Sequence, residues 1–278
     1  MSDNTDKPLA LVETSKPLTI LDAVAALPQV KEFFRQFATI LLEVRDAVNA
    51  YRPKILEFLE TIRAIPDAVK ECTLELAKLG WFYDIQFLSE EFVSTLKLVR
   101  GKKVEELDSF FINHYEQQAR SLQRRLTLSH PERAKPLRQA FAAASKGNYF
   151  VAIPALLAQI DGLAIKVGGG KLFTNENKRP QVASKLEEKE LDGFTLAFLS
   201  ALLQHTGFNA SEKYEDEFPH APNRHKIMHG IDLGYGTKAN YLKTFSLLAF
   251  IGVYVPEILR NKSKVRNASK PTAVDAKV

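Results

Sequence analysis

The chain contains a single cysteine, Cys72, among its 278 residues. One thiol cannot form an intramolecular disulfide, and a cysteine-based metal site is excluded as well. No apolar run approaches the ~20 residues that a membrane-spanning helix needs. The first seventeen residues are polar, contain Pro8 and Pro17, and lack the basic-then-apolar order of a signal peptide. We therefore expect a cytoplasmic protein with no membrane partner.

The chain also lacks a strong excess of charge, because 38 Lys and Arg stand against 33 Asp and Glu, for a net charge of +5. Such mild basicity is compatible with a nucleic-acid partner but does not indicate one by itself. Much of the excess follows Leu259, where a single acid, Asp275, stands against Arg260, Lys262, Lys264, Arg266, Lys270 and Lys277. A solvated tail explains this run, so we expect disorder at residues 261–278, as at residues 1–17.

Apolar residues spaced three and four apart dominate the rest of the chain, and this spacing is typical of helices with one buried stripe. We expect a helix between Val30 and Val48, a second from Pro53 and a third from Pro66 to about Leu79. Further helices are expected at 89–99, 104–126, 132–145, 149–165, 191–205 and 237–259. No strand alternation and no internal repeat are evident. The predicted fold class is therefore all-α, with an N-terminal helical bundle at 18–130 and a C-terminal one at 131–260.

A glycine run, Gly168-Gly169-Gly170-Lys171, resembles the end of a phosphate-binding loop. Such a loop needs a glycine five residues before the Gly-Lys pair and a Ser or Thr after it. Ile165 and Leu172 occupy those places and no strand precedes them. We interpret residues 167–181 as a connecting loop.

His225 and His229 have the i,i+4 spacing of a metal-chelating pair on one helix face. The zinc-protease pattern requires a Glu directly after the first His, and Lys226 stands there instead. We expect no metal and no cofactor.

Arg224 and His229, separated by four residues within Asn223–Gly230, suit phosphodiester chemistry. An imidazole exchanges a proton near neutral pH, and a guanidinium binds phosphate oxygens without losing its charge. In a helix the two residues span about one and a half turns. They can therefore reach a common cleft only near a helix end or across a second copy of the protein.

The stretch Arg224-His225-Lys226-Ile227-Met228-His229 resembles the Arg-polar-x-x-x-His signature of the HEPN superfamily (higher eukaryotes and prokaryotes nucleotide-binding). The resemblance extends over Asn223–Gly230, with Tyr235, Thr237 and Asn240 before an apolar helix, and covers about the C-terminal half. It implies an all-helical domain and a metal-independent endoribonuclease acting on RNA as a homodimer. Arg224 would hold the phosphate and His229 would act as general base or acid.

The same resemblance implies supporting or RNA-binding roles for His225, Asn223 and Tyr235. In this family an acidic or polar residue on an inner helix faces the motif, and Asp161 is the first candidate for that role and Gln159 the second. Asp161 is equally compatible with a hydrogen-bonded residue near a helix end.

Other interpretations remain open. Arg224 can pair with Asp216 or Glu217, and His229-Gly230 can simply end a short helix. A non-catalytic HEPN-like nucleotide- or RNA-binding adaptor and a helical interaction scaffold are the rival functions. If the chain is a ribonuclease, the resemblance implies a toxin or phage-defence effector with an antitoxin or defence-system partner.

Overall fold

The computed structural model describes residues 52–260 except 87–88, 177–178, 190 and 211–215, with side chains from Ile65 onward. The helix expected between Val30 and Val48 lies outside the described residues. So does the disorder expected at residues 1–17 and 261–278.

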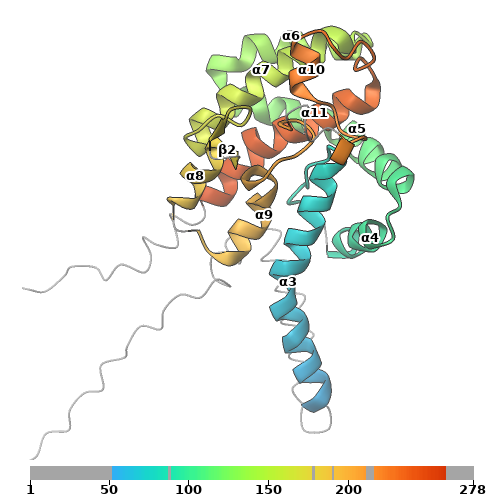
Figure 1. Ribbon diagram of the computed structural model, residues 1–278, viewed down its shortest axis with the longest axis vertical. Coiled ribbons are helices and arrows are strands. Elements are labelled where there is room, and N and C mark those ends of the chain that lie inside the picture. The colour runs from blue at the N-terminus through green and yellow to red at the C-terminus, as the bar shows by residue number, and fades with distance from the viewer. Residues whose placement is uncertain (1–51, 87–88, 177–178, 190, 211–215, 261–278) are drawn as a thin grey trace, which may run out of the picture.

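Helices make up most of the described chain, which confirms the all-α fold class (Figure 1). In chain order they are α3 (Arg52–Lys78), α4 (Ser89–Arg100), α5 (Val104–Ser129), η1 (Pro131–Arg133), α6 (Ala134–Ser145), α7 (Tyr149–Gly168), α8 (Gln181–Glu187), α9 (Gly193–Leu203), α10 (Arg224–Met228), α11 (Lys238–Ala249) and η3 (Phe250–Tyr254). Two short strands, β1 (Asn175–Glu176) and β2 (Arg179–Pro180), pair antiparallel within the expected loop. The sequence predicts no strand there, because a two-residue pair is too short to show alternation.

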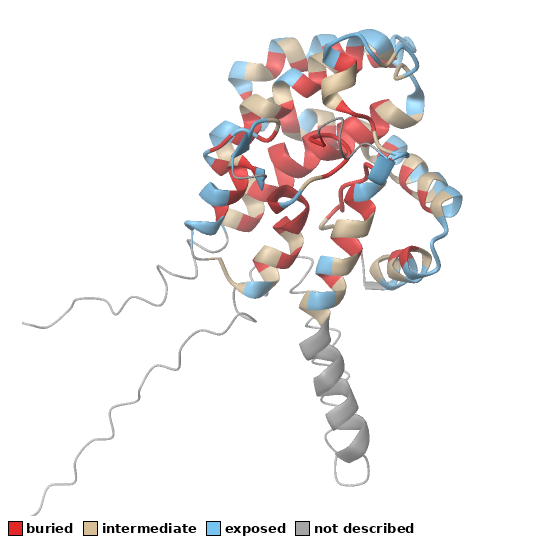
Figure 2. Ribbon diagram, viewed as in Figure 1, coloured by how far each residue is buried: buried red, intermediate tan, exposed pale blue. Residues whose placement is uncertain are grey.

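The centre of the molecule is α11 and its continuation η3, a π-helical turn. Every residue from 241 to 255 is buried, and Figure 2 shows this segment within the buried interior. α11 packs against α7 and α5, while α6 packs on α7 and α3 on α9. A helix that is buried on all sides needs apolar residues around its whole circumference, which explains the dense apolar run of α11.

One core connects the two regions that the sequence places on either side of Pro131. Leu126 of α5, Leu137 of α6 and Phe245 of α11 belong to the same cluster of buried side chains. The expected boundary therefore falls inside a shared core, and the described residues of both regions pack as one unit.

Proline does not divide the helices as the sequence suggests. Pro66 is predicted to begin a new helix, but it lies inside α3, which is continuous from Arg52 to Lys78. Proline removes one backbone hydrogen bond and can bend a helix without ending it. Pro154 lies inside α7 in the same way.

Glycine marks the helix ends better. Gly80 follows α3 with φ +87°, and Gly147 turns the chain between α6 and α7 with φ +76°. These left-handed conformations favour glycine, and the turn at Gly147 joins α6 and α7 into a pair of packed helices.

Two helices are long and apolar enough to cross a membrane by length and composition, Tyr149–Gly168 and Lys238–Arg260. This corrects the expectation that no apolar segment approaches that length. In the second helix 83% of the apolar window is buried inside the protein, against 39% in the first. Because the core helix of a soluble protein passes the same test, these two helices by themselves do not indicate a membrane span.

Candidate functional site

The predicted motif folds into α10, a helix of five residues that begins with a side-chain cap. The side chain of Asn223 accepts a hydrogen bond from the Lys226 backbone N–H at 3.2 Å. Its amide donates to the Ala210 carbonyl at 3.2 Å, and the Arg224 N–H donates to the Phe208 carbonyl at 3.2 Å. Asparagine is a preferred residue at this position because it satisfies backbone N–H groups that have no partner within the helix. Asn223 thus anchors the start of α10 on the turn at 206–210.

The other end of α10 closes with a glycine turn. Gly230 has φ +68°. Its backbone N–H donates to the Ile227 carbonyl at 3.2 Å, and the Ile231 N–H donates to the Lys226 carbonyl at 2.8 Å. This pair of bonds is the Schellman arrangement that ends many helices. It places His229 at the last, half-helical position, with its side chain exposed.

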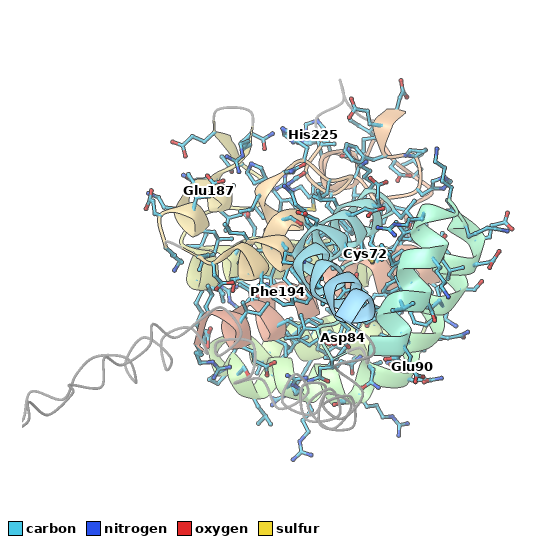
Figure 3. The ribbon with its side chains drawn as sticks, turned by 90° about the horizontal axis from the view of Figure 1, so that it is seen from below. Cys72, Asp84, Glu90, Glu187, Phe194 and His225 are labelled. Atoms are coloured by element: carbon cyan, nitrogen blue, oxygen red, sulfur yellow. The ribbon has the colours of Figure 1, made fainter. Side chains whose placement is uncertain are left out.

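The two histidines of the motif lie together on one face. The ring centres of His225 and His229 are 4.3 Å apart, with their planes tilted by 49°. His225 is half-buried, and Figure 3 shows it near the edge of the molecule, whereas Cys72 and Asp84 lie near the middle. The imidazole side of α10 is therefore open to solvent at His229.

Arg224 has a different neighbour. The central carbon of its guanidinium, Cζ, lies over the ring of Phe173, 5.6 Å from the ring centre. Among the described residues, no ion pair joins Arg224 to Asp216 or Glu217, the partners considered from the sequence. Five helical positions correspond to a rotation of about 140°. By this helical spacing we expect Arg224 and His229 to point in different directions within one subunit.

Asp161 and Gln159 both lie on α7 but form hydrogen bonds with different parts of the chain. Asp161 accepts hydrogen bonds from the backbone N–H groups of Leu172 at 2.9 Å and Phe173 at 3.2 Å. Gln159 accepts one from the Arg133 guanidinium at 3.1 Å. Asp161 thus reaches the motif through Phe173, while Gln159 contacts the start of the α6 region.

Tyr235 fixes the loop that follows α10. Its hydroxyl donates to the Phe150 carbonyl at 2.8 Å, and its ring meets the Phe150 ring edge-on at 5.1 Å. The Asn240 amide donates to the Tyr235 carbonyl at 3.1 Å. Thr237 caps α11 by accepting the Asn240 N–H at 3.1 Å. These bonds tie residues 235–240 to the start of α7.

Apolar side chains are exposed around the motif. Met228, Ile231 and Leu233 are 43%, 52% and 80% exposed, and Phe150 and Val151 at the start of α7 are 54% and 64% exposed. These five, which we call the motif-side patch, are most of the eight large hydrophobic residues exposed in the described ranges. An exposed apolar group of this kind is typical of an interaction surface.

A buried lysine holds the segment that leads into the motif. Lys243 of α11 donates to the His220 carbonyl at 2.8 Å and lies 3.1 Å from an Asp108 carboxylate oxygen. The same Asp108 oxygen, Oδ1, accepts a hydrogen bond from the Trp81 Nε1–H at 2.6 Å, and the other oxygen, Oδ2, lies 3.5 Å from the Lys243 Nζ. Burial lowers the pKa of Lys243, and Asp108 opposes that shift. Helices α5 and α11 thus position the chain before α10.

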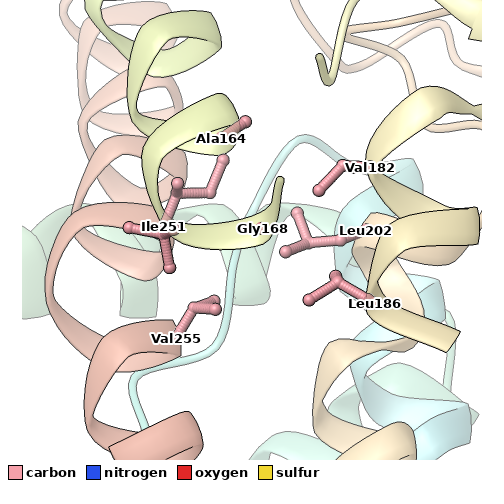
Figure 4. A pocket seen from close by; sticks show the side chains of 8 residues that line it. Ala164, Gly168, Val182, Leu186, Leu202, Ile251 and Val255 are labelled. Atoms are coloured by element: carbon pink, nitrogen blue, oxygen red, sulfur yellow. The ribbon is translucent and has the colours of Figure 1, made fainter. Parts of the chain in front are cut away.

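The described residues outside the motif contain no comparable group of candidate catalytic or ligand-binding side chains among those considered next. No group of three or more His, Cys, Asp or Glu that could hold a metal ion occurs there. Cys72 is fully buried, and burial raises the pKa of its thiol to about 12, so it is not a reactive nucleophile. A cavity of about 10 Å³ between α7, α8, α9 and η3 is lined by apolar residues including Ala164, Val182 and Ile251 (Figure 4). It has room for about one water molecule and no polar group to bind a substrate.

Sequence reasoning missed Phe173 and the turn at 206–210. Phe173 directly follows the glycine-rich loop, about fifty residues before α10, and no spacing rule connects the two. Asn223 did carry a signal for the cap of α10, since an asparagine before a short helix predicts one, but that signal does not point to the turn at 206–210.

Comparisons of the chain with protein-family models, with curated proteins and with solved structures give no match.

Proposed function

We propose that this chain is a metal-independent endoribonuclease whose site forms between two copies of the protein. The observation that carries the proposal is the arrangement of α10, a capped surface helix with His229 exposed to solvent and Arg224 against the ring of Phe173. Imidazole transfers protons near neutral pH, and guanidinium binds phosphate. The two groups that RNA transesterification needs thus occupy one short exposed element.

In this reaction the 2′-hydroxyl of the RNA attacks the adjacent phosphorus and the 5′-oxygen of the next nucleotide leaves. One imidazole takes the proton from the 2′-hydroxyl, and another gives a proton to the leaving oxygen. Arg224 stabilises the charge that develops on the phosphate oxygens. The products are a 2′,3′-cyclic phosphate and a 5′-hydroxyl.

A second copy supplies the second imidazole, because one histidine cannot act as base and acid at the same moment. The motif-side patch supports this assembly, since burying Met228, Ile231 and Leu233 against a partner removes apolar surface from water. We propose a homodimer in which each composite site takes Arg224 and His229 from both subunits.

The remaining motif residues have supporting roles. Asn223 sets the position of α10 through its cap, and Tyr235 orients the following loop. His225 contacts phosphate or positions the motif of the second copy. Asp161 acts on the motif side of α7, and Gln159 is the more distant of the two candidates.

The HEPN resemblance further suggests a cytoplasmic toxin or phage-defence effector, because unrestrained RNA cleavage harms the host cell. Such an enzyme requires restraint, and we propose an antitoxin or a defence-system partner as its source.

A non-catalytic adaptor is the second candidate. The motif-side patch favours it, because an apolar surface can bind a partner without any chemistry at Arg224 or His229. The adaptor would use the same fold for nucleotide or RNA binding, or serve as a helical scaffold.

The test is incubation of the full chain with labelled total RNA in EDTA, followed by mapping of the product ends. Wild type is expected to cleave and leave cyclic phosphates, and Arg224→Ala/His229→Ala is expected to be inactive. His220→Ala is the matched control, because His220 lies in the same segment with an exposed side chain and bonds Lys243 only through its backbone. Folded, inactive wild type would favour the adaptor, and cleavage by the double variant would refute the site.

A further inference from the structure

The charged group of Arg224 lies against an aromatic ring, and that ring comes from a separate loop. Phe173 comes from the glycine-rich connection after α7, and its ring centre lies 5.6 Å from the guanidinium Cζ. A cation this close to a ring face is attracted by the negative face of the ring. The contact uses none of the five N–H donors of the guanidinium, so they stay available for a phosphate.

A carboxylate holds the backbone of the loop that carries the Phe173 ring. Asp161 accepts hydrogen bonds from the backbone N–H groups of Leu172 and Phe173, at 2.9 and 3.2 Å, and so fixes the loop to α7. Leu172 is buried and anchors the same loop in the core. On its far side the loop is bonded to α8, because the Val182 N–H donates to the Lys171 carbonyl at 3.0 Å. The backbone that carries Phe173 is therefore fixed at several points, although the loop has little regular structure.

We infer that Phe173 is a positioning residue that orients Arg224 for an RNA phosphodiester, and that Asp161 acts on Arg224 by holding Phe173 in place. Arginine has many rotamers. Restricting them before binding lowers the side-chain conformational entropy that is lost when a phosphate binds. The inference deepens the proposed ribonuclease by naming how its phosphate-binding residue is prepared, and it rests on that proposal for the identity of the ligand.

The contact itself is tested by NMR on the full chain with labelled arginine, without any ligand. The Arg224 side-chain protons should be displaced upfield by the ring current of Phe173, with Arg224→Lys used to assign them. Phe173→Leu should abolish the displacement, Phe173→Tyr should keep it, and Asp161→Ala should reduce it more than Asp161→Asn, which retains an acceptor. Phe194→Leu on α9 is the matched control and should leave the Arg224 signal unchanged.

The consequence for binding is tested with a 2′-O-methyl oligoribonucleotide, which cannot be cleaved, by fluorescence anisotropy. Phe173→Leu should weaken binding by about two- to fivefold, the range expected for an exposed cation–π contact, and Phe173→Tyr should restore it. In the cleavage assay Phe173→Leu should raise KM while leaving the pH dependence of kcat unchanged, because proton transfer is assigned to His229.

The NMR experiment and the RNA-binding experiment together distinguish failure of the inference from failure of the proposed function. An Arg224 signal that is unaffected by Phe173→Leu would overturn the positioning role, whatever the chain does to RNA. Equal affinity of wild type and Phe173→Leu for the oligonucleotide would also overturn it. If wild type neither binds nor cleaves RNA, the proposed ribonuclease fails, and the NMR result still decides whether Phe173 and Asp161 orient Arg224.

Discussion

Helices α11 and α10 lie close together in the sequence but are held in place by different interactions. α11 is buried on every side, and the ring of its Phe245 lies 6.3, 5.8 and 6.1 Å from the rings of Tyr115, Phe141 and Tyr241. In α10 only Ile227 is buried, and the helix depends on a few hydrogen bonds at its two ends. Dispersion and burial are shared among many atoms, whereas each hydrogen bond at α10 has a single partner. The core helix therefore determines stability, and the exposed helix has side chains available for chemistry.

The largest expected effect is on the core helix. Phe245→Ala should lower the free energy of unfolding by about 3–5 kcal/mol, because it leaves a cavity where a fully buried ring contacts three others. Urea unfolding followed by circular dichroism measures this loss. The matched change on α10, Met228→Ala, should alter stability by less than about 0.5 kcal/mol, since the residue is already 43% exposed in the folded chain. Similar losses from both variants would contradict the division between the helices.

A somewhat smaller effect is expected where α11 reaches the segment before α10. Lys243→Ala should cost about 2–4 kcal/mol, because the Asp108 carboxylate loses its ammonium partner and the His220 carbonyl loses its donor. Trp81 is the single tryptophan of the chain and donates to the same Asp108, so its fluorescence reports both the local change and unfolding. Lys243→Met keeps most of the volume and should lose less. If Lys243→Ala has the stability and the Trp81 emission of wild type, Lys243 does not connect α11 to the segment before α10.

The contrast between these helices also explains what the sequence could predict. The apolar run of α11 predicts its burial directly, and the pattern of Asn223 before Arg224 predicts the cap of α10. The contact between Phe173 and Arg224 could not be predicted from the sequence. It depends on how the loop that carries Phe173 packs against α10, which lies about fifty residues later in the chain. Likewise Pro66 disfavours a continuous α3 locally, yet the helix runs through it. Local patterns predict elements, whereas long-range contacts arise from packing that no local pattern records.

Alkaline pH should weaken the core that surrounds α11. Burial raises the pKa of Tyr83, Tyr115 and Tyr241. Unfolded tyrosine ionises near pH 10, so above about pH 10 the unfolded chain releases protons that the folded chain keeps, and stability falls. Tyr241→Phe removes one such group. Its stability should fall less steeply than that of wild type, by about 1.4 kcal/mol per pH unit, as urea titrations on both sides of pH 10 would measure. Parallel curves for the two proteins would contradict the assignment.

The smallest stability effect gives the most direct comparison, because both helices begin with a side-chain cap. Asn223 accepts the Lys226 N–H at the start of α10, and Thr237 accepts the Asn240 N–H at the start of α11. Replacing either by alanine should cost about 1 kcal/mol of stability. The local consequences should differ, since packing keeps α11 in place without its cap while α10 has little else to hold it. Hydrogen exchange should therefore accelerate at Lys226 in Asn223→Ala far more than at Asn240 in Thr237→Ala, and RNA cleavage should fall only in Asn223→Ala. Equal acceleration at both sites would mean that α10 is held by more than its end bonds, and the contrast between the helices would then be one of exposure alone.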